Sequence, residues 1–207
     1  MSANPNSRLE TFTDGVLAIA ITLLILEIKV PSRDQLHSVA ELKNALAEHW
    51  TSWFAFGLSF LALFIGWTNH HRMMSMLNKT SPAFIYAHGF LLLTISVYPF
   101  VTSLLAEYMN TSYAAFPVFL YCLSNMIHAF AWVLVYHCIL WPKDLTKNEV
   151  LQLRAGRLRT TILYTVVFNA LMCVLAFFAP LIALILTAMA WIVYLILGIR
   201  LSPLEEE

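Results

Sequence analysis

Ionisable side chains stand inside apolar segments of this chain, where they could take part in proton or metal chemistry. Asp14 lies near the start of the apolar stretch RLETFTDGVLAIAITLLILEIKVP (residues 8–31). His70 and His88 lie at the ends of two later apolar segments. A carboxylate inside a membrane costs roughly 3 kcal/mol or more unless it is paired or faces water. Asp14 therefore needs a partner.

The candidate partners are nearby donors of several kinds. Arg8 and Thr13 are close to Asp14 in sequence, and the segment WTNHHR (residues 67–72) precedes the helix that carries His88. Indole, imidazole and hydroxyl donors around a carboxylate make an embedded charge tolerable. We interpret Asp14 as the centre of a structural network whose other members are Arg8, Thr13, Trp67, His70 and His88.

Two other chemistries remain open for these residues. Asp14, His70 and His88 could form a proton relay in a proton-coupled transporter or a proton leak. However, these groups gather at one depth, and no inverted repeat is visible. The isolated His128 and His137 would be needed for a haem protein or membrane enzyme, which we consider the weakest hypothesis. The chain has no HExxH motif, so we expect no metal site, no cofactor and no enzymatic activity.

Composition places the chain in the membrane. It has 207 residues, of which 60% are apolar and 12% charged, and its mean hydropathy is +0.73. Soluble domains are about a quarter charged. The net charge is zero, so no basic field points to nucleic acid as a partner. We predict an all-α, multi-pass membrane protein.

Six segments are long enough to cross about 30 Å of hydrocarbon. We expect a single transmembrane domain over residues 1–204 and an acidic tail over 205–207. Residues 34–49 have apolar side chains at helical spacing and predict a short amphipathic helix outside the membrane. The predicted spans lie near residues 9–30, 50–77, 82–106, 113–140, 158–178 and 181–200.

The distribution of Lys and Arg predicts the orientation. With the N-terminus inside, nine of the 12 basic residues fall on the inner side and three (Lys29, Arg33 and Lys43) fall outside. Cytoplasmic loops carry such an excess. Both termini are therefore expected in the cytoplasm, with the chain in a plasma membrane.

The first helix has a narrow face with nearly heptad spacing. At about 100° per residue, Asp14 points about 140° away from Ile19 and so away from this face. The pattern fits a helix packed around a common axis, and it also fits ordinary helix packing. The residues that share the face are Phe12, Gly15, Ile19, Thr22, Leu23, Leu26 and Val30.

The motif that carries Asp14 resembles a known family. Arg8, Phe12, Thr13, Asp14 and Gly15 are similar to the RxxxF-S-D-G motif of the transmembrane protein 175 family, with threonine in place of serine. These proteins are potassium channels of endosomes and lysosomes, with shorter bacterial homologues. The resemblance continues in the stretch AIAITLLIL (residues 18–26), in the WxxH pattern of Trp67 and His70, and in YPF at residues 98–100.

This resemblance implies a bacterial homotetramer in which four copies of the first helix surround the pore. Ile19, Leu23 and Leu26 would form apolar rings and Thr22 a hydroxyl ring, with K⁺ as the permeant ion and weak preference over Na⁺. The family lacks a TVGYG filter, and this sequence contains no such string. The expected partners are the chain itself, membrane lipids and potassium ions.

Two acidic residues lie near the ends of the first helix. Glu10 and Glu27 could concentrate cations at the inner and outer mouths, or they could be solvated helix-end residues.

Overall fold

The computed structural model describes residues 6–141 and 145–200, so the expected acidic tail at 205–207 lies outside the described residues. The described part is helical, and six of its helical stretches are long and apolar enough to cross a membrane. This agrees with the predicted all-α class and the predicted number of spans. The elements are α1 (Ser7–Leu23), α2 (Val39–Glu48), α3 (Trp50–Ser75), α4 (Pro82–Ser96), α5 (Tyr98–Tyr108), α6 (Ala115–Leu140), α7 (Glu149–Leu175) and α8 (Pro180–Arg200), with short 3₁₀ turns at Leu24–Glu27 and Arg33–Gln35.

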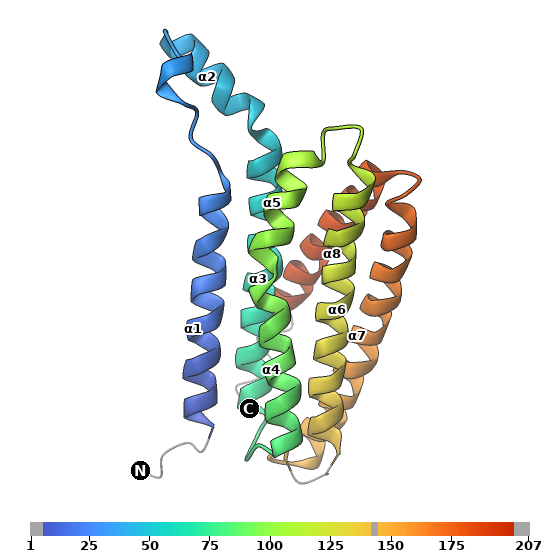
Figure 1. The fold of residues 1–207 in the computed structure, drawn as a ribbon. Coiled ribbons are helices and arrows are strands. Elements are labelled where there is room, and N and C mark those ends of the chain that lie inside the picture. The colour runs from blue at the N-terminus through green and yellow to red at the C-terminus, as the bar shows by residue number, and fades with distance from the viewer. Residues whose placement is uncertain (1–5, 142–144, 201–207) are drawn as a thin grey trace.

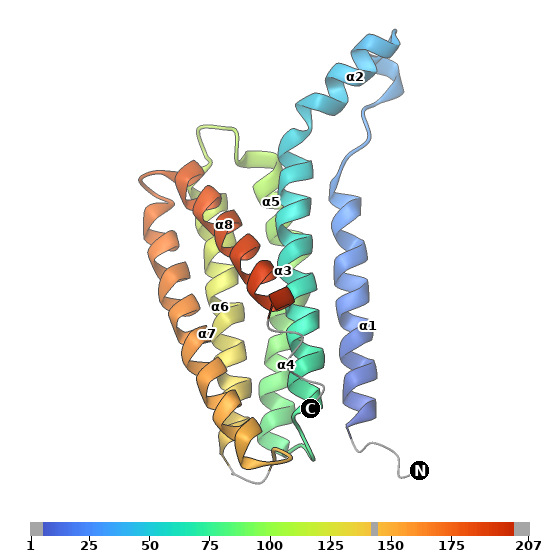
Figure 2. The same cartoon turned by 180° about the vertical axis from the view of Figure 1, so that it is seen from behind.

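The helices form a bundle with α1 at one edge. Figure 1 shows α1 beside α3 and α4, whereas α6 and α7 stand together at the opposite edge. In Figure 2, α8 crosses the bundle obliquely from the end of α7 toward α3. The first helix is therefore a peripheral part of this protomer.

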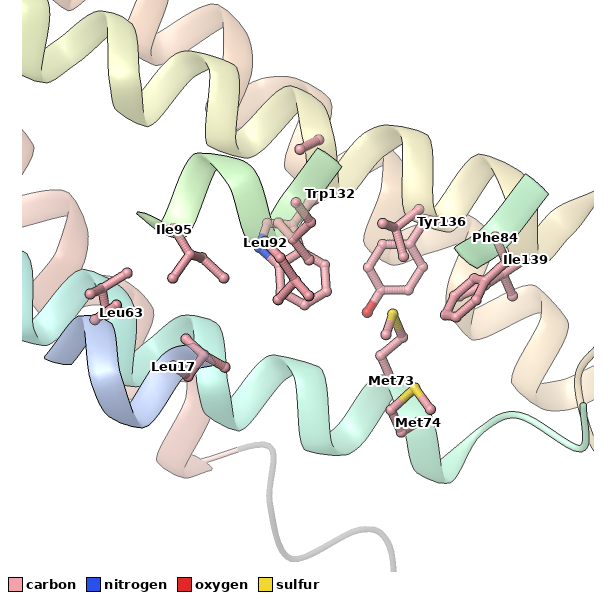
Figure 3. Close-up of a cluster of buried hydrophobic side chains, with 14 of the residues drawn as sticks. Leu17, Leu63, Met73, Met74, Phe84, Leu92, Ile95, Trp132, Tyr136 and Ile139 are labelled. Atoms are coloured by element: carbon pink, nitrogen blue, oxygen red, sulfur yellow. The ribbon is translucent and has the colours of Figure 1, made fainter. Parts of the chain in front are cut away.

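The core lies between α1 and the helices behind it. Figure 3 shows Leu17 of α1 and Leu63 of α3 turned toward Ile95 of α4. Trp132 of α6 belongs to the same buried cluster. A second buried cluster joins α3, α5, α6, α7 and α8 at the other end of the bundle. Apolar burial thus fixes α1 to the bundle through one of its faces.

The third span is made of α4 and α5, which are separated by Val97. Pro99 stands in the first turn of α5, where its missing N–H is tolerated because the first N–H groups of a helix have no acceptor within it. Buried polar contacts surround this break: the Tyr98 hydroxyl donates to Asn125 Oδ1 at 2.7 Å, and Thr102 Oγ1 donates to Ser59 Oγ at 2.7 Å. These bonds tie the interrupted span to α6 and α3.

Helix α7, which carries the fifth span, begins at Glu149, before the expected start of that span near residue 158. Its N-terminus is capped by Asn148, whose Oδ1 accepts from the Leu151 N–H at 2.9 Å. The predicted span near 158–178 covered only the apolar part of this helix. Arg154 and Arg157 instead lie on the first turns of a helix, because charged residues do not interrupt helical geometry.

The predicted amphipathic helix in 34–49 occupies Val39–Glu48 as α2. Ser38 caps it, with Oγ accepting from the Glu41 N–H, while the Glu41 carboxylate accepts from the His37 N–H. This is a reciprocal cap. None of the α2 residues is buried, and α2 projects beyond the ends of α1 and α3 (Figure 1).

Candidate functional site

The first helix has one buried face and one exposed apolar face. Leu17, Ala20 and Leu24 are almost completely buried against the bundle, as is Thr13. On the other side, Ile19 is 61% exposed and Leu26 is 71% exposed. Large apolar side chains are therefore left uncovered over much of the helix. The remaining members of the predicted face, Phe12, Gly15, Thr22, Leu23 and Val30, are exposed as well.

Thr22 contributes the hydroxyl of this exposed face. Its Oγ1 donates to backbone carbonyls of its own helix, at 2.8 Å to Ala18 O or 3.0 Å to Ile19 O. The hydroxyl proton therefore points back into the helix. The oxygen lone pairs are left for an acceptor role, and an oxygen of this kind can replace one water around a cation.

The end of the first span is wound more tightly than its middle. Leu24–Glu27 form a 3₁₀ turn, in which residues three apart lie one above the other. This geometry brings Leu26 into line with Leu23. Just beyond it, Lys29 Nζ pairs with Glu107 Oε2 of α5 at 3.1 Å. The ion pair offsets the positive charge of Lys29 near Glu27.

The donors expected around Asp14 are divided between two separate contacts. Trp67 Nε1 donates to Asp14 Oδ1 at 3.0 Å, on the exposed side of α1 and α3. His88 instead contacts Thr13 at 2.8 Å, in the buried interior. Within the described residues, no ion pair joins Arg8 to Asp14, and Arg8 is exposed.

The Thr13 contact defines the protonation of His88. Thr13 Oγ1 donates its proton to Leu9 O at 2.9 Å, so it must accept from His88 Nε2. His88 Nε2 then carries the hydrogen and Nδ1 is the acceptor. His88 Nδ1 has no hydrogen-bond partner, and the ring is completely buried.

His70 lies beside His88, with 5.0 Å between their ring centroids. Its Nε2 is buried and also has no hydrogen-bond partner. The described residues contain no group of three or more His, Cys, Asp or Glu side chains that could hold a metal ion. The two rings are thus a buried pair placed behind α1.

His128, which the haem or membrane-enzyme hypothesis would need, lies in a network where its hydrogen bonds are satisfied. His128 Nδ1 contacts Thr94 Oγ1 at 2.8 Å, and Trp132 Nε1 donates to His128 Nε2 at 3.1 Å. Both ring nitrogens have partners, so this histidine is structural. The sequence could have indicated the contact between His128 and Trp132, because residues four apart are neighbours on a helix.

Comparisons with known proteins agree on one family. The model of the family described as "Endosomal/lysosomal potassium channel TMEM175" matches residues 8–99. A potassium channel of Chamaesiphon minutus is 39% identical over 150 residues, which are 72% of this chain and 71% of that protein. A protein of Gallus gallus named an endosomal/lysosomal proton channel is 37% identical over 93 residues, covering 38% of this chain and 19% of its own length.

A solved structure shares the fold. The crystal structure of a lysosomal potassium-selective channel TMEM175 homolog from Chamaesiphon minutus superimposes with a TM-score of 0.83. The two chains are 28% identical, and the match covers 93% of this chain and 97% of the other.

Proposed function

Because this chain belongs to the TMEM175 family of potassium channels, we propose that α1 lines its ion pathway. Four copies assemble around an axis on the exposed side of α1, with both termini in the cytoplasm and the bundle in a bacterial plasma membrane. The assembly is a channel for K⁺ with weak preference over Na⁺, and it has no enzymatic activity.

One observation carries this proposal: α1 buries one face in its own bundle and leaves the opposite, apolar face uncovered. Such a face meets either lipid or other copies of the chain. Thr22 and its free lone pairs lie in the middle of it, where lipid offers no partner for oxygen. A shared axis gives both the apolar side chains and the hydroxyl a role.

Selection in this arrangement falls to side chains, since no TVGYG segment supplies carbonyl oxygens. Rings of Ile19, Leu23 and Leu26 form a narrow apolar constriction that a cation passes only after losing water. A ring of Thr22 oxygens replaces part of that water. K⁺ loses its water at lower cost than Na⁺, which gives a modest preference for K⁺.

The same apolar rings can close the pathway. A constriction lined by Ile and Leu loses its water when it narrows slightly, and ions do not cross a dry segment. We assign this hydrophobic gate to the ring formed by Ile19 or to those of Leu23 and Leu26. The in-line placement of Leu23 and Leu26 in the 3₁₀ turn favours a continuous apolar segment there.

Acidic residues supply cations to the two mouths in this proposal. Glu27 lies at the outer end of the first span, where the Lys29–Glu107 pair reduces the opposing positive charge. Glu10 lies in the first turn of α1. Each acid repeated around an axis gives a ring of negative charge.

The testing experiment is ion flux from proteoliposomes that hold the purified protein. A K⁺ gradient, a Na⁺ gradient and a proton gradient are imposed in turn on the same preparation. We expect K⁺ flux to exceed Na⁺ flux and to need no protons. Transport that occurs only when protons are supplied would refute the channel.

The buried His70–His88 pair favours a second candidate, a proton pathway. Each ring has a nitrogen without a partner, and a relay needs such acceptors. Asp14 would be the third member, but its oxygen is held by Trp67 on the exposed side. The proton gradient of the same experiment measures this activity, and His88→Gln should abolish it.

A further inference from the structure

A lone guanidinium lies between α6 and α7, at the edge of the bundle farthest from α1. Arg159 of α7 places Nη1 3.5 Å from His137 Nδ1 of α6, a contact at the limit of hydrogen bonding. Its Nε is buried and has no hydrogen-bond partner. Within the described part of the chain, no ion pair involves Arg159.

Among the described residues, no carboxylate pairs with this positive charge. Arg72 of α3 shows how the fold satisfies such a group elsewhere, since its Nη2 donates to Gly198 O at 2.7 Å, near the end of α8. In the part of the chain that the structure describes, no carbonyl or carboxylate accepts from Arg159 in this way. A partly buried guanidinium in a membrane helix needs one, because an unpaired charge there is costly.

The position of the pair in the membrane identifies what could supply the anion. Trp141 follows His137 by about one helical turn, lies just after the end of α6 and is 75% exposed. Exposed tryptophans at helix ends mark the level of the lipid headgroups. His137 is exposed as well, and it precedes Trp141 by four residues, a helical rise of about 6 Å, so the pair is placed near the level of the headgroups.

The chemistry of the two side chains fits a phosphate. Since Arg159 Nη1 is the donor in their contact, His137 Nδ1 is the acceptor and Nε2 carries the hydrogen. The terminal guanidinium nitrogens and this N–H are then donors for phosphate oxygens. Arginine binds phosphate with planar, charge-assisted hydrogen bonds.

We propose that Arg159 and His137 bind the phosphate of an anionic phospholipid at the inner ends of α6 and α7. The acyl chains then lie along the exposed apolar side chains farther up α7, which include Leu163, Tyr164 and Val167. This site is on the opposite edge of the protomer from α1 (Figure 1). It is independent of the proposed ion pathway.

The test is native mass spectrometry of the purified protein in a non-ionic detergent, with phosphatidylglycerol and phosphatidylcholine of equal acyl chains. We expect the wild-type protein to retain phosphatidylglycerol in preference to phosphatidylcholine. Arg159→Gln should lower that preference about fivefold, since one basic residue at a membrane surface contributes about that much. Arg157→Gln, which removes the same charge from an exposed position two residues away, should keep it.

Two results with the arginine variants would overturn the proposed site. The first is that Arg159→Gln keeps the preference for phosphatidylglycerol. The second is that Arg157→Gln loses as much of this preference as Arg159→Gln, which would mean that the lipid is attracted by the general positive charge of α7. Inorganic phosphate is added in a separate arm. If it displaces phosphatidylglycerol at equal concentration, the site binds free phosphate and the lipid proposal is wrong. Should Arg159→Gln fail to assemble, His137→Ala at an exposed position decides, and an unchanged preference in that variant contradicts the proposal.

Discussion

Trp67 of α3 holds Asp14 of α1 by a hydrogen bond of 3.0 Å from the indole nitrogen to a carboxylate oxygen. This bond joins the exposed side of α1 to the neighbouring helix. It lies one residue along the chain from the buried contact of Thr13 with His88. Two adjacent residues therefore hold the first helix to the protomer, Asp14 through an exposed contact and Thr13 through a buried one.

Removing the indole donor should weaken α1 packing more than it alters ion preference. Trp67→Phe keeps an aromatic ring but removes the indole donor to the exposed Asp14, and the net loss of such a hydrogen bond is about 0.5–1.5 kcal/mol. We expect a lower unfolding temperature and less intact assembly in size-exclusion chromatography. Trp53→Phe, another exposed tryptophan of α3, is the matched control. Adding Asp14→Asn to Trp67→Phe should restore part of the loss, and no restoration would contradict the assignment.

Asp14→Asn alone should damage assembly or expression more than selectivity. Asparagine keeps an oxygen that accepts from Trp67 but loses the charge that strengthens the bond. The measurement compares the yield of assembled protein with the K⁺ to Na⁺ flux ratio. An intact assembly with a changed flux ratio would place Asp14 in the ion pathway.

The buried Thr13 hydroxyl should be needed for stability. Thr13→Val keeps the shape but leaves the His88 Nε2–H without an acceptor, which should cost about 1–3 kcal/mol. The control is Thr11→Val, because the exposed Thr11 hydroxyl bonds only to Ser7 O of its own helix. Thermal unfolding in detergent should separate the two variants. Equal unfolding temperatures would rule out a stabilising role for the Thr13–His88 contact.

The oxygen of Thr22 should matter for ion discrimination. Thr22→Val replaces the hydroxyl by a methyl of similar size and should lower the ratio of K⁺ to Na⁺ flux. Thr22→Ser keeps the oxygen and should keep most of the ratio. Proteoliposome flux measures both, with assembly checked for each variant. The hydroxyl ring would be excluded if Thr22→Val behaved like the wild-type protein.

Shortening an apolar ring should raise conductance. Ile19→Ala removes three carbons from a side chain that is 61% exposed in the single protomer, so the proposed constriction widens and wets more easily. Ile25→Ala removes the same atoms outside the predicted face and should leave flux unchanged. Single-channel recording or flux rates test this. Identical rates in both variants would remove Ile19 from the pathway.

Much of the fold could be predicted because membrane helices follow hydropathy. The long apolar runs predicted six spans, and the break before Pro99 did not end the third span. Helix α7 begins at Glu149, before the predicted span near 158–178, because hydropathy reports the apolar part of a helix and not the polar turns that precede it. Similarly, the helical part of the first span, which is α1 and the 3₁₀ turn after it, ends at Glu27 and not near residue 30, since Ile28 adopts an extended backbone.

The polar contacts were harder to predict than the helices. The sequence placed Asp14, Thr13, Trp67 and His88 at similar depths, but depth does not determine which donor meets which acceptor. One helical step of about 100° separates Thr13 from Asp14, and that step sends one into the core and the other to the edge. Rotations of this kind depend on how α1 packs against α3 and α4, which periodicity alone does not fix.

The narrow attachment of α1 has a consequence for how such a protein can change over generations. Its buried contacts occupy one stripe, from Thr13 to Leu24, and its uncovered face shares no side chain with that stripe. Substitutions on the uncovered face therefore leave the packing energy of the bundle untouched. In the proposed assembly, ion preference and the stability of the protomer are therefore separable traits, and selection can adjust one with little effect on the other.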